Sequence, residues 1–549
     1  MSTLPAVSKV PMNEPQRSDG STEARVIPEL LRERAAMHPD RPYLGCEDRS
    51  FTYAEIDTRT DRVAAGLAEH GVAPGDRVAV ISANRMEMLE LFFACAKAGA
   101  AMVPLNVFLK GEFLRYQLRD SQAQTLVVDG PGLESAGDLL GELPDLARLV
   151  TLDAPERIAV ESVSYDIVAS STAQVPSPGL SPSSLMSILY TSGTTGMPKG
   201  CMLPHGWYMN GARVSSEMVE YRTDDVLFTA LPLFHAWAQG IVMGALVHHL
   251  TAWVDPIFSV TRLLDRFLET GASVFTGVGA MGMAMLGAPP SDKDRAHRLR
   301  CALMIPFTPE QQEMFKARFG ATVLSQLYGQ TECGAITYAR LSERRNLGSI
   351  GRPAPYLEVR LHDDDDREVP AGSVGEIVVR PRVPNALYLG YWRKPSATVE
   401  AWRNLWHHTG DYGRADAEGF ITFVDRKKDA LRRRGENVSS QELERAIASH
   451  PAIAEAAVIG VPSPMTEDDI KACIVVVSDS GVPSPSELFA FFKEVLPYFA
   501  IPRYVEVVPE LPKNATLRVM KHLLREGGVT PETWDLVAMG FEVGRDARR

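Results

Sequence analysis

The stretch LYTSGTTGMPKG at residues 189–200 decides how the rest of the chain is interpreted. It extends a short apolar run, residues 185–190, that suits a buried strand. Its glycines allow backbone N–H groups to approach an anion closely, and its hydroxyls and lysine add donors and a positive charge. The spacing differs from the Walker A pattern. The stretch predicts a phosphate-binding loop rather than an ordinary Gly/Thr-rich surface loop, and the candidate residues are Thr191, Ser192, Gly193, Thr194, Thr195, Gly196 and Lys199.

Length and composition limit the class of protein. At 549 residues the chain is too long for one compact core, so at least two domains are expected. It is 45% hydrophobic and 23% charged, as soluble globular proteins are, and its net charge of −12 gives no reason to expect nucleic acid or an anionic membrane as partner. The 6 cysteines are scattered without a C-x-x-C pair, which argues against a disulfide framework or zinc site and favours a reduced, cytoplasmic setting.

No segment of the sequence resembles a membrane anchor. Residues 1–26 are polar and lack the apolar core of a signal peptide, so they are expected to form a disordered tail. The most apolar long stretch, residues 91–108, is interrupted by Lys97, Pro104 and Asn106 and is not expected to span a bilayer.

Alternating strand and helix patterns predict the fold class. Thr52 and Glu55 have the spacing of a capping box, and they are followed by a strand at residues 77–82 and a helix at residues 86–98. From about residue 348 short strands alternate with turns, and the acidic run at residues 363–366 is expected to be a solvated hairpin tip. We predict an α/β fold: a disordered tail (1–26), an N-terminal domain of two α/β subdomains and a small β-barrel-like unit (27–427), a small mobile α+β C-terminal domain (428–530) and a tail (531–549).

Four ordered motifs together resemble one superfamily. They are TSGTTGMPKG at residues 191–200, YGQTE at 328–332, HHTGD at 407–411 and DRKKD at 425–429. This combination is similar to the adenylate-forming enzymes, which comprise acyl- and aryl-CoA synthetases, peptide-synthetase adenylation domains and luciferases. The resemblance covers residues 26–527, and the segment DALRRRGENVSSQELE at 429–444 looks most similar to crotonobetaine/carnitine-CoA ligase-like members.

The resemblance implies a reaction in two halves and a role for each motif. A carboxylic acid reacts with ATP to give an acyl-adenylate and pyrophosphate, and the thiol of CoA then displaces AMP. Thr331 would hydrogen-bond the α-phosphate, and Glu332 would be the Mg²⁺ ligand if ATP is used, a hard donor for a hard cation. Asp411 would accept the ribose hydroxyls, and Arg426, Tyr328 and Gly329 would complete the nucleotide site.

The acyl pocket is expected around two further segments. His235, in PLFH at residues 232–235, matches a position that lines the pocket in the superfamily, although a histidine of the core is the alternative. Members that activate amino acids carry an aspartate there, so His235 disfavours an amino-acid substrate. The small residues Gly277, Gly279 and Ala280 match the other wall, and their size predicts a roomy pocket for a bulky acid.

The resemblance also assigns the hinge and the CoA site. Lys428 occupies the hinge position about which the C-terminal domain would rotate between the two half-reactions. A strand containing Gly435 and Glu436 would face the adenylate, and Arg433 and Arg434 would meet the CoA phosphates, unless they form a solvated basic turn. Too little chain follows residue 524 for a carrier-protein module, so free CoA is the expected acceptor.

Two departures from the superfamily pattern affect the first half-reaction. Leu517 and Arg518 stand where a glycine and the catalytic lysine are expected, and MIPF at residues 304–307 replaces a glycine-rich strand beside the adenine. We therefore hypothesise that adenylation is weak or lost and that a separate ligase supplies the acyl-adenylate. A complete ATP-dependent ligase is the main alternative, and a luciferase-like oxidase or a non-catalytic adenylate-binding protein are others. The oligomeric state, a dimer included, stays open.

Overall fold

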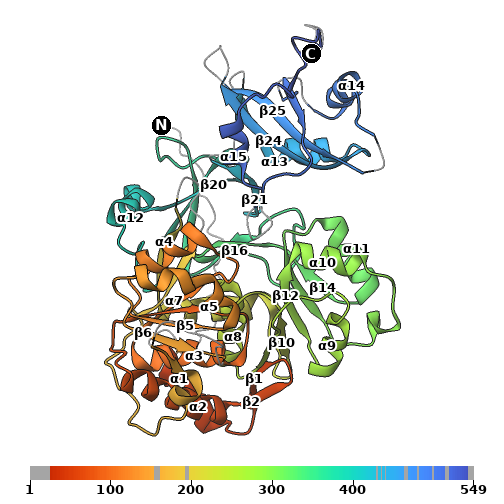
Figure 1. Cartoon of the computed structure of the whole chain (residues 1–549). Helices are drawn as coiled ribbons and strands as arrows, with labels where there is room; N and C mark the ends of the chain where they lie inside the picture. The colour runs from red at the N-terminus through yellow and green to blue at the C-terminus, as the bar shows by residue number, and fades with distance from the viewer. Residues whose placement is uncertain are drawn as a thin grey trace, which may run out of the picture.

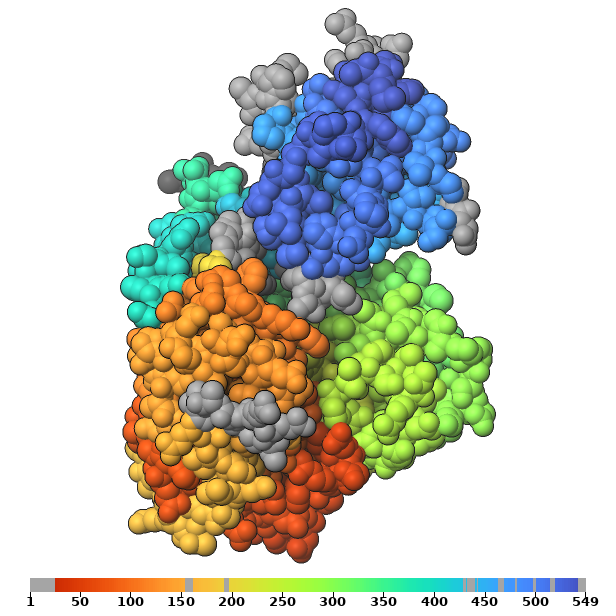
Figure 2. All heavy atoms as spheres, in the orientation of Figure 1, coloured from red at the N-terminus to blue at the C-terminus, as the bar shows by residue number. Residues whose placement is uncertain are grey.

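A computed structural model describes the protein over most of its length. The described residues are 25–153, 161–191, 197–427, 431–433, 436–438, 440–462, 468–478, 481–496, 500–513 and 519–541. They form a large N-terminal body of two α/β halves and an antiparallel unit, and a smaller C-terminal domain (Figure 1). In Figure 2 the C-terminal domain, in blue, lies over both the orange and the green parts of the N-terminal body.

The first α/β half is a 7-stranded sheet with the order β7-β6-β5-β3-β4-β8-β9. All neighbouring strands are parallel except the β8–β9 pair, which is antiparallel. The strands are β3 (Arg77–Ile81), β4 (Ala101–Leu105), β5 (Thr125–Val128), β6 (Arg148–Thr151), β7 (Val163–Ser164), β8 (Leu185–Thr191) and β9 (Lys199–Pro204). The helices of this part are α1 (Ile27–Met37), α2 (Tyr53–Glu69), α3 (Met86–Ala98), α4 (Gly111–Ser121), α5 (Gly130–Ala136), α6 (Tyr165–Ala169) and α7 (His205–Val219).

Local sequence signals explain where several of these helices begin. The predicted capping box is confirmed, since the Thr52 side chain accepts the N–H of Glu55 and the Glu55 side chain accepts the N–H of Thr52 at the start of α2. Helix α3 has the predicted bounds and is buried along almost its whole length, which suits its apolar composition. None of the helices in the described part of the chain is long and apolar enough to cross a bilayer.

The second α/β half is also a 7-stranded sheet, with the order β14-β13-β12-β10-β11-β1-β2. Two strands of this sheet, β1 and β2, come from the start of the chain, so the N-terminal segment joins the two halves. The strands are β1 (Pro42–Cys46), β2 (Arg49–Thr52), β10 (Val226–Thr229), β11 (Thr251–Val254), β12 (Val274–Val278), β13 (Cys301–Ile305) and β14 (Thr322–Leu324), and the helices are α8 (Ala236–His248), α9 (Leu263–Thr270), α10 (Gly279–Gly287) and α11 (Pro309–Phe319).

The expected β-barrel-like unit is not a barrel. The region forms a 3-stranded sheet, β15-β16-β17, and a 4-stranded antiparallel sheet, β18-β19-β20-β21, whose edge strands β18 and β21 are not paired with each other among the described residues. Four short strands are too few to curl round and close on themselves, so this sheet stays open. The bounds are β15 (Leu327–Gln330), β16 (Gly334–Tyr338), β17 (Arg352–Pro353), β18 (Leu357–His362), β19 (Val374–Pro381), α12 (Pro395–Ala401), β20 (His407–Ala415) and β21 (Ile421–Arg426).

The C-terminal domain is α+β, as predicted. A 4-stranded sheet, β24-β25-β26-β27, packs with its helices around a separate apolar cluster, and β22 and β23 form a hairpin beside it. The elements are β22 (Leu431–Arg433), β23 (Glu436–Val438), α13 (Ser440–Ala448), β24 (Ile453–Pro462), β25 (Asp468–Val476), α14 (Pro485–Val495), β26 (Tyr504–Val507), α15 (Lys521–Gly527) and β27 (Trp534–Asp535).

The expected tail from residue 531 is wrong for its first part. Strand β27 pairs with β26, and Leu536 is buried in the cluster of this domain. Arg503 also donates to the Asp535 carboxylate at 2.8 Å. Residues 531–541 therefore belong to the domain, because an apolar anchor and an ion pair hold a segment that looks polar overall.

Candidate functional site

The predicted phosphate loop is the connection of a β-hairpin. Strands β8 and β9 are antiparallel, and Thr191 lies opposite Lys199 in their register. The Thr191 hydroxyl lies 3.4 Å from the Lys199 carbonyl and 3.8 Å from the Cys201 sulfur. The two described ends of the loop are thus fixed by strand pairing, while residues 192–196, which include Ser192, Gly193, Thr194, Thr195 and Gly196, lie outside the described residues.

Tyr391 connects the loop lysine to Glu332. Lys199 Nζ lies 4.8 Å from the centre of the Tyr391 ring, a cation–π contact, and the Tyr391 hydroxyl donates to Glu332 Oε1 at 2.9 Å. The main chain reinforces this arrangement, because Tyr391 forms a bridge with Cys201 of β9 and the N–H of Tyr388 donates to the Glu332 carbonyl at 2.8 Å. Burial and the Glu332 charge raise the pKa of Tyr391, so its hydroxyl stays a donor. The sequence prediction missed this residue.

Glu332 lies in a tight turn, residues 331–333, that joins β15 to β16. A side chain at Gly329 would collide with the carbonyl of Gly334 on the neighbouring strand, so only glycine fits there. Thr331 is partly exposed in the turn, and Glu332 is 9% exposed. The turn therefore presents a hydroxyl and a carboxylate side by side at the edge of the N-terminal body.

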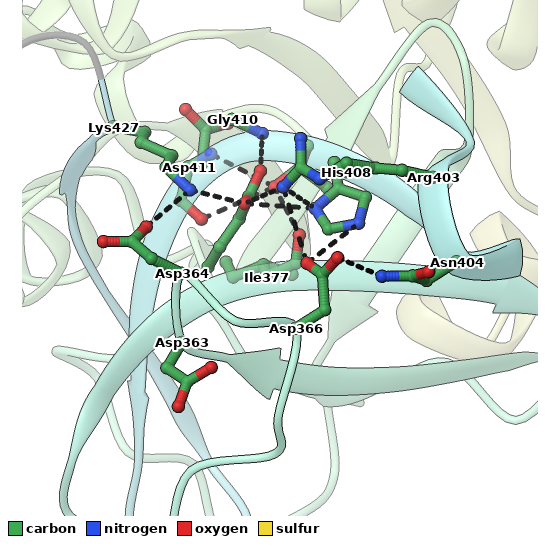
Figure 3. A network of polar contacts seen from close by, with 12 residues as sticks. Asp363, Asp364, Asp366, Ile377, Arg403, Asn404, His408, Gly410, Asp411 and Lys427 are labelled. Carbon is green, nitrogen blue, oxygen red and sulfur yellow. Dashed lines mark hydrogen bonds and ion pairs between the residues drawn. The ribbon is translucent and has the colours of Figure 1, made fainter. Parts of the chain in front are cut away.

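Asp411 on β20 faces the same turn. Its Oδ2 accepts the Tyr328 hydroxyl at 2.6 Å and the Gln330 amide at 3.0 Å, while Arg426 Nε lies 3.6 Å from its Oδ1 (Figure 3 shows Asp411). Burial and the Asp411 charge raise the pKa of Tyr328, so this hydroxyl donates at neutral pH. Three predicted residues, Tyr328, Asp411 and Arg426, thus meet here, and Gln330 is a further member that prediction omitted although it lies in the same motif.

His235 lies at the C-terminal edge of the second sheet. It directly precedes α8 and is exposed, while the surrounding protein excludes enough water to lower the pKa of its ring. The loop before it is held by buried Asn84, which accepts the N–H of Leu233 at 2.7 Å and donates to the Leu231 carbonyl at 2.8 Å. His235 is therefore an exposed imidazole whose lowered pKa favours the neutral form, rather than a histidine of the core.

The expected pocket glycines lie at the same edge. Parallel pairing of β10, β12 and β13 places their C-terminal ends together, and Gly277 and Gly279 come at the end of β12. Both glycines are buried, whereas Ala280 is exposed. The carboxyl ends of the strands are where open α/β sheets bind ligands.

These glycines do not leave the open volume that the sequence suggested. A Cβ at Gly279 would overlap the carbonyl oxygen of Pro306, and a Cβ at Gly277 would press on the ring of Phe275. A Cβ at Gly282 would meet the side chains of Met304 and Phe307. Small residues are needed here for close packing between α10 and the end of β13, so they carry no evidence for a roomy pocket.

Gly279→Ala should destabilise the N-terminal body. The obstacle is backbone, which cannot rotate away, so we expect a loss of about 2 kcal/mol, as for other overpacked sites. Thermal unfolding should show a Tm lowered by roughly 4–8 °C. Gly287→Ala in the same helix is the matched control, because its Cβ would meet none of the described residues within 4 Å and should leave the Tm unchanged. An unchanged Tm for Gly279→Ala would contradict the packing.

The substituted stretch at residues 304–307 divides into two parts. Met304 and Phe307 are 0% and 4% exposed and belong to an apolar cluster of the second sheet. Ile305 is partly exposed and Pro306 is exposed. The larger residues are therefore not all accessible to a ligand, and the changes that could affect a bound base are confined to Ile305 and Pro306.

Several predicted site residues cannot be placed. Lys428, Arg434, Gly435 and Arg518 lie outside the described residues, and for Arg433 and Glu436 the structure gives the backbone alone. Arg433 and Glu436 are paired opposite each other in the β22–β23 hairpin. The hinge, CoA and catalytic-arginine assignments thus stay predictions.

Comparison with known proteins gives the same picture over nearly the whole chain. The family described as AMP-binding enzyme matches residues 31–392, and the AMP-binding enzyme C-terminal domain matches residues 442–517. The crotonobetaine/carnitine–CoA ligase of Citrobacter koseri is 32% identical over 87% of this chain and 93% of its own length.

Solved structures agree in fold. The anthranilate CoA ligase AuaEII in complex with anthranoyl-AMP superimposes with a TM-score of 0.80 at 25% identity, covering 92% of this chain and 97% of that one. The O-succinylbenzoate coenzyme A synthetase of Bacillus subtilis, in complex with ATP and a magnesium ion, gives 0.78 at 28% identity, covering 90% and 98%.

Proposed function

The chain belongs to the AMP-binding enzyme family, and from that membership we propose that it is an acid–thiol ligase of the AMP-forming acyl-CoA synthetase type. The observation that carries the proposal is the convergence of Lys199, Glu332 and Asp411 on one edge of the N-terminal body, held by Tyr391 and Tyr328. A cation, a carboxylate beside a hydroxyl, and a buried acceptor suit the phosphates and the ribose of a nucleotide.

In the thioester-forming step the sulfur of CoA attacks the carbonyl carbon of an acyl-adenylate. The C–S bond forms, the bond from the carbonyl carbon to the phosphate oxygen breaks, and AMP leaves with the electron pair while the thiol loses its proton. Asp411 and Tyr328 would hold the ribose side of the adenylate, and Thr331 would donate to its phosphate. Positioning of this kind is the main contribution that a protein makes to such a transfer.

The first half-reaction is proposed to be weak or absent. Arg518 replaces the lysine that the family places against the α-phosphate and carboxylate, and loss of one such donor costs about 10²–10³ in rate. A separate ligase would then supply the acyl-adenylate. The specific alternative is a complete ATP-dependent ligase, which is favoured by the intact contacts of Lys199, Glu332 and Asp411 and by the relative that was solved with ATP and magnesium.

The residues around Glu332 fit a magnesium ion. Glu332 offers carboxylate oxygens, which are hard donors, and its Oε1 is oriented by the hydrogen bond from Tyr391, while Thr331 adds a hydroxyl. Bound Mg²⁺ would neutralise charge on the phosphates of ATP. Tyr391 acts on this site by holding the Glu332 carboxylate in place.

Tyr391→Phe should affect the two half-reactions unequally. The ring that contacts Lys199 stays, while Glu332 loses a donor worth about 1.5–3 kcal/mol. We expect the ATP-dependent reaction to fall roughly 10- to 100-fold and to need more Mg²⁺. Turnover of acyl-AMP with CoA should change by no more than about twofold. Equal losses in both assays would contradict the assignment of Tyr391 to the metal side of the site.

The acid substrate is proposed from the relatives and from His235. The relatives named above act on crotonobetaine or carnitine, anthranilate and O-succinylbenzoate, all carboxylic acids, and a carboxylic acid is proposed for this chain. His235 offers a neutral ring beside the strand ends, where an aspartate would be needed to pair with the ammonium of an amino acid. A screen of these acids for those that raise the melting temperature would identify the substrate class.

One comparison tests the proposed function. Purified protein is given either acid, ATP and CoA, or synthetic acyl-AMP and CoA, with the acid selected by the thermal screen. We expect acyl-CoA from the second mixture at a rate at least about 100-fold above that from the first. Equal rates would establish the complete ligase instead. Absence of acyl-CoA from both would favour a non-catalytic binding protein, and light or O₂ uptake would favour the oxidase.

A further inference from the structure

Glu376 on β19 contacts two backbone segments that serve different parts of the site. Its side chain is buried, with the residue 2% exposed. Oε1 accepts the N–H of Gly410 at 3.1 Å, and Oε2 accepts Lys427 Nζ at 3.1 Å. In Figure 3 the labelled residues Gly410 and Lys427 lie next to each other. One carboxylate therefore holds the residue before Asp411 and the residue after Arg426.

Gly410 is held from its other side as well. The N–H of Lys427 donates to the Gly410 carbonyl at 2.8 Å, so Lys427 is bonded to Gly410 through its backbone and to Glu376 through its side chain. Gly410 has φ of 70°, a conformation that favours glycine. Glu376, Gly410 and Lys427 thus form a closed triangle of hydrogen bonds. A shift of any one of these residues strains its hydrogen bonds to the other two.

The charged groups around Glu376 keep its carboxylate ionised. Arg403 Nη2 lies 3.3 Å and His408 Nδ1 3.1 Å from Oε2, and Lys427 also contacts Asp364 Oδ1 at 2.9 Å. Burial alone would raise the pKa of Glu376, but the His408 hydrogen bond and the Lys427 charge lower it to about 2. A buried carboxylate with several donors is rigid, and losing one donor leaves it poorly compensated.

Lys427 stands at the junction of the two domains. It follows the end of β21, and residues 428–430 lie outside the described residues. On the far side of the junction α13 begins at Ser440, whose N–H donates to Asp425 Oδ2 at 2.6 Å. The C-terminal domain is thus joined to the N-terminal body next to the Glu376 triangle.

We propose that Glu376 and Lys427 are positioning residues that couple occupation of the Asp411 turn to the orientation of the C-terminal domain. The inference rests on the proposed function in so far as Asp411 binds a nucleotide. A ligand that binds Asp411 shifts the neighbouring Gly410. Because Gly410 is hydrogen-bonded to Lys427, this shift also moves the backbone at the start of the connection to the C-terminal domain. Because coupling between sites is reciprocal, the domain orientation also alters nucleotide affinity.

The test uses AMP and two fluorophores on the full chain. All 6 cysteines are buried, so Glu313→Cys on α11 and Glu494→Cys on α14, both exposed, can be labelled selectively. In this otherwise unaltered chain, AMP should change energy transfer between the labels. Lys427→Met keeps the Glu376–Gly410 bond, so AMP should still bind, with its affinity changed only by the lost coupling, about fivefold, while the change in energy transfer falls by at least half. Glu376→Gln should weaken AMP binding about tenfold and also reduce the change in transfer.

Asp365→Asn is the matched control, since Asp365 lies on the same turn as Asp364 and contacts Arg367 instead of Lys427. It should behave as the unaltered chain does. The inference is overturned if Lys427→Met shows the full AMP-induced change, or if the unaltered chain binds AMP without any change, in which case the proposed function still stands. A chain that does not bind AMP at all overturns both. If Lys427 had a purely structural role, Lys427→Met would lower stability, and it would not reduce the change in energy transfer separately from AMP affinity.

Discussion

Replacing Leu517 and Arg518 by glycine and lysine should raise the ATP-dependent rate of acyl-CoA formation about 100-fold. The proposal attributes the weak first half-reaction to these positions, where arginine presents a wide planar group in place of a compact ammonium. Leucine also resists the positive φ that a glycine at this position would allow. The double variant restores the compact ammonium group and a glycine that can adopt a positive φ. The measurement is acyl-CoA formed from acid, ATP and CoA.

Two comparisons make this result specific. Turnover of synthetic acyl-AMP with CoA should stay within about twofold, because the restored lysine serves the first half-reaction. Arg344→Lys, an exposed arginine of the N-terminal body, makes the same chemical exchange and should change neither rate. If the double variant leaves the ATP reaction unchanged while acyl-AMP is still consumed, these positions are not the obstacle. The segment at residues 304–307 would then be the remaining sequence difference to test.

The elements that could be predicted from sequence are those encoded by neighbouring residues. The capping box at Thr52 and Glu55, the helix at residues 86–98 and the α+β pattern after residue 440 all agree with the structure. Caps and periodic apolar faces depend on spacings of a few residues, so they can be read from the chain alone. The motif residues Tyr328 and Asp411 were likewise found in contact, 83 positions apart, because each lies in a recognisable pattern.

Contacts that depend on folding were missed. Tyr391 reaches Glu332 across 59 positions, and Glu376 reaches Gly410 across 34, without a local pattern to connect them. Sequence placed the acidic run at residues 363–366 on a solvated tip, yet the Asp366 side chain is 11% exposed and contacts Asn404. A run of acidic residues predicts that the segment as a whole is exposed to solvent. Whether one of its side chains is buried depends on which residues the fold brings next to it.

The glycines at residues 277 and 279 show a different limit. Small side chains predict space for a ligand, but the same feature also allows two segments to pack closely, and the backbone at Pro306 occupies the space beside Gly279. Composition cannot distinguish these outcomes, because both require the absence of a side chain. Sheet closure was similarly beyond prediction, since alternating short strands suit an open sheet as well as a barrel.

Asp411→Asn should lower AMP affinity about 100-fold, since hydrogen bonds to a charged acceptor contribute about 1.5–3 kcal/mol each. The carboxylate already accepts Tyr328 and Gln330 on one oxygen, and the other oxygen lies near Arg426. An amide removes the charge and places an N–H group against donors, whichever way it is turned. Titration calorimetry with AMP measures the loss without requiring turnover.

Both half-reactions should suffer in this variant, in contrast to Tyr391→Phe, because every intermediate carries the ribose that Asp411 is proposed to hold. Tyr328→Phe is the matched control. It removes one donor to Asp411 but keeps the carboxylate that is proposed to accept the ribose hydroxyls, so AMP affinity should fall only about three- to tenfold. An Asp411→Asn protein that binds AMP as tightly as the Tyr328→Phe protein would show that the carboxylate braces the β15–β20 contact and does not bind the nucleotide. A selective loss of AMP affinity at an unchanged melting temperature would instead place the ribose at Asp411, because a brace that fails lowers stability and binding together.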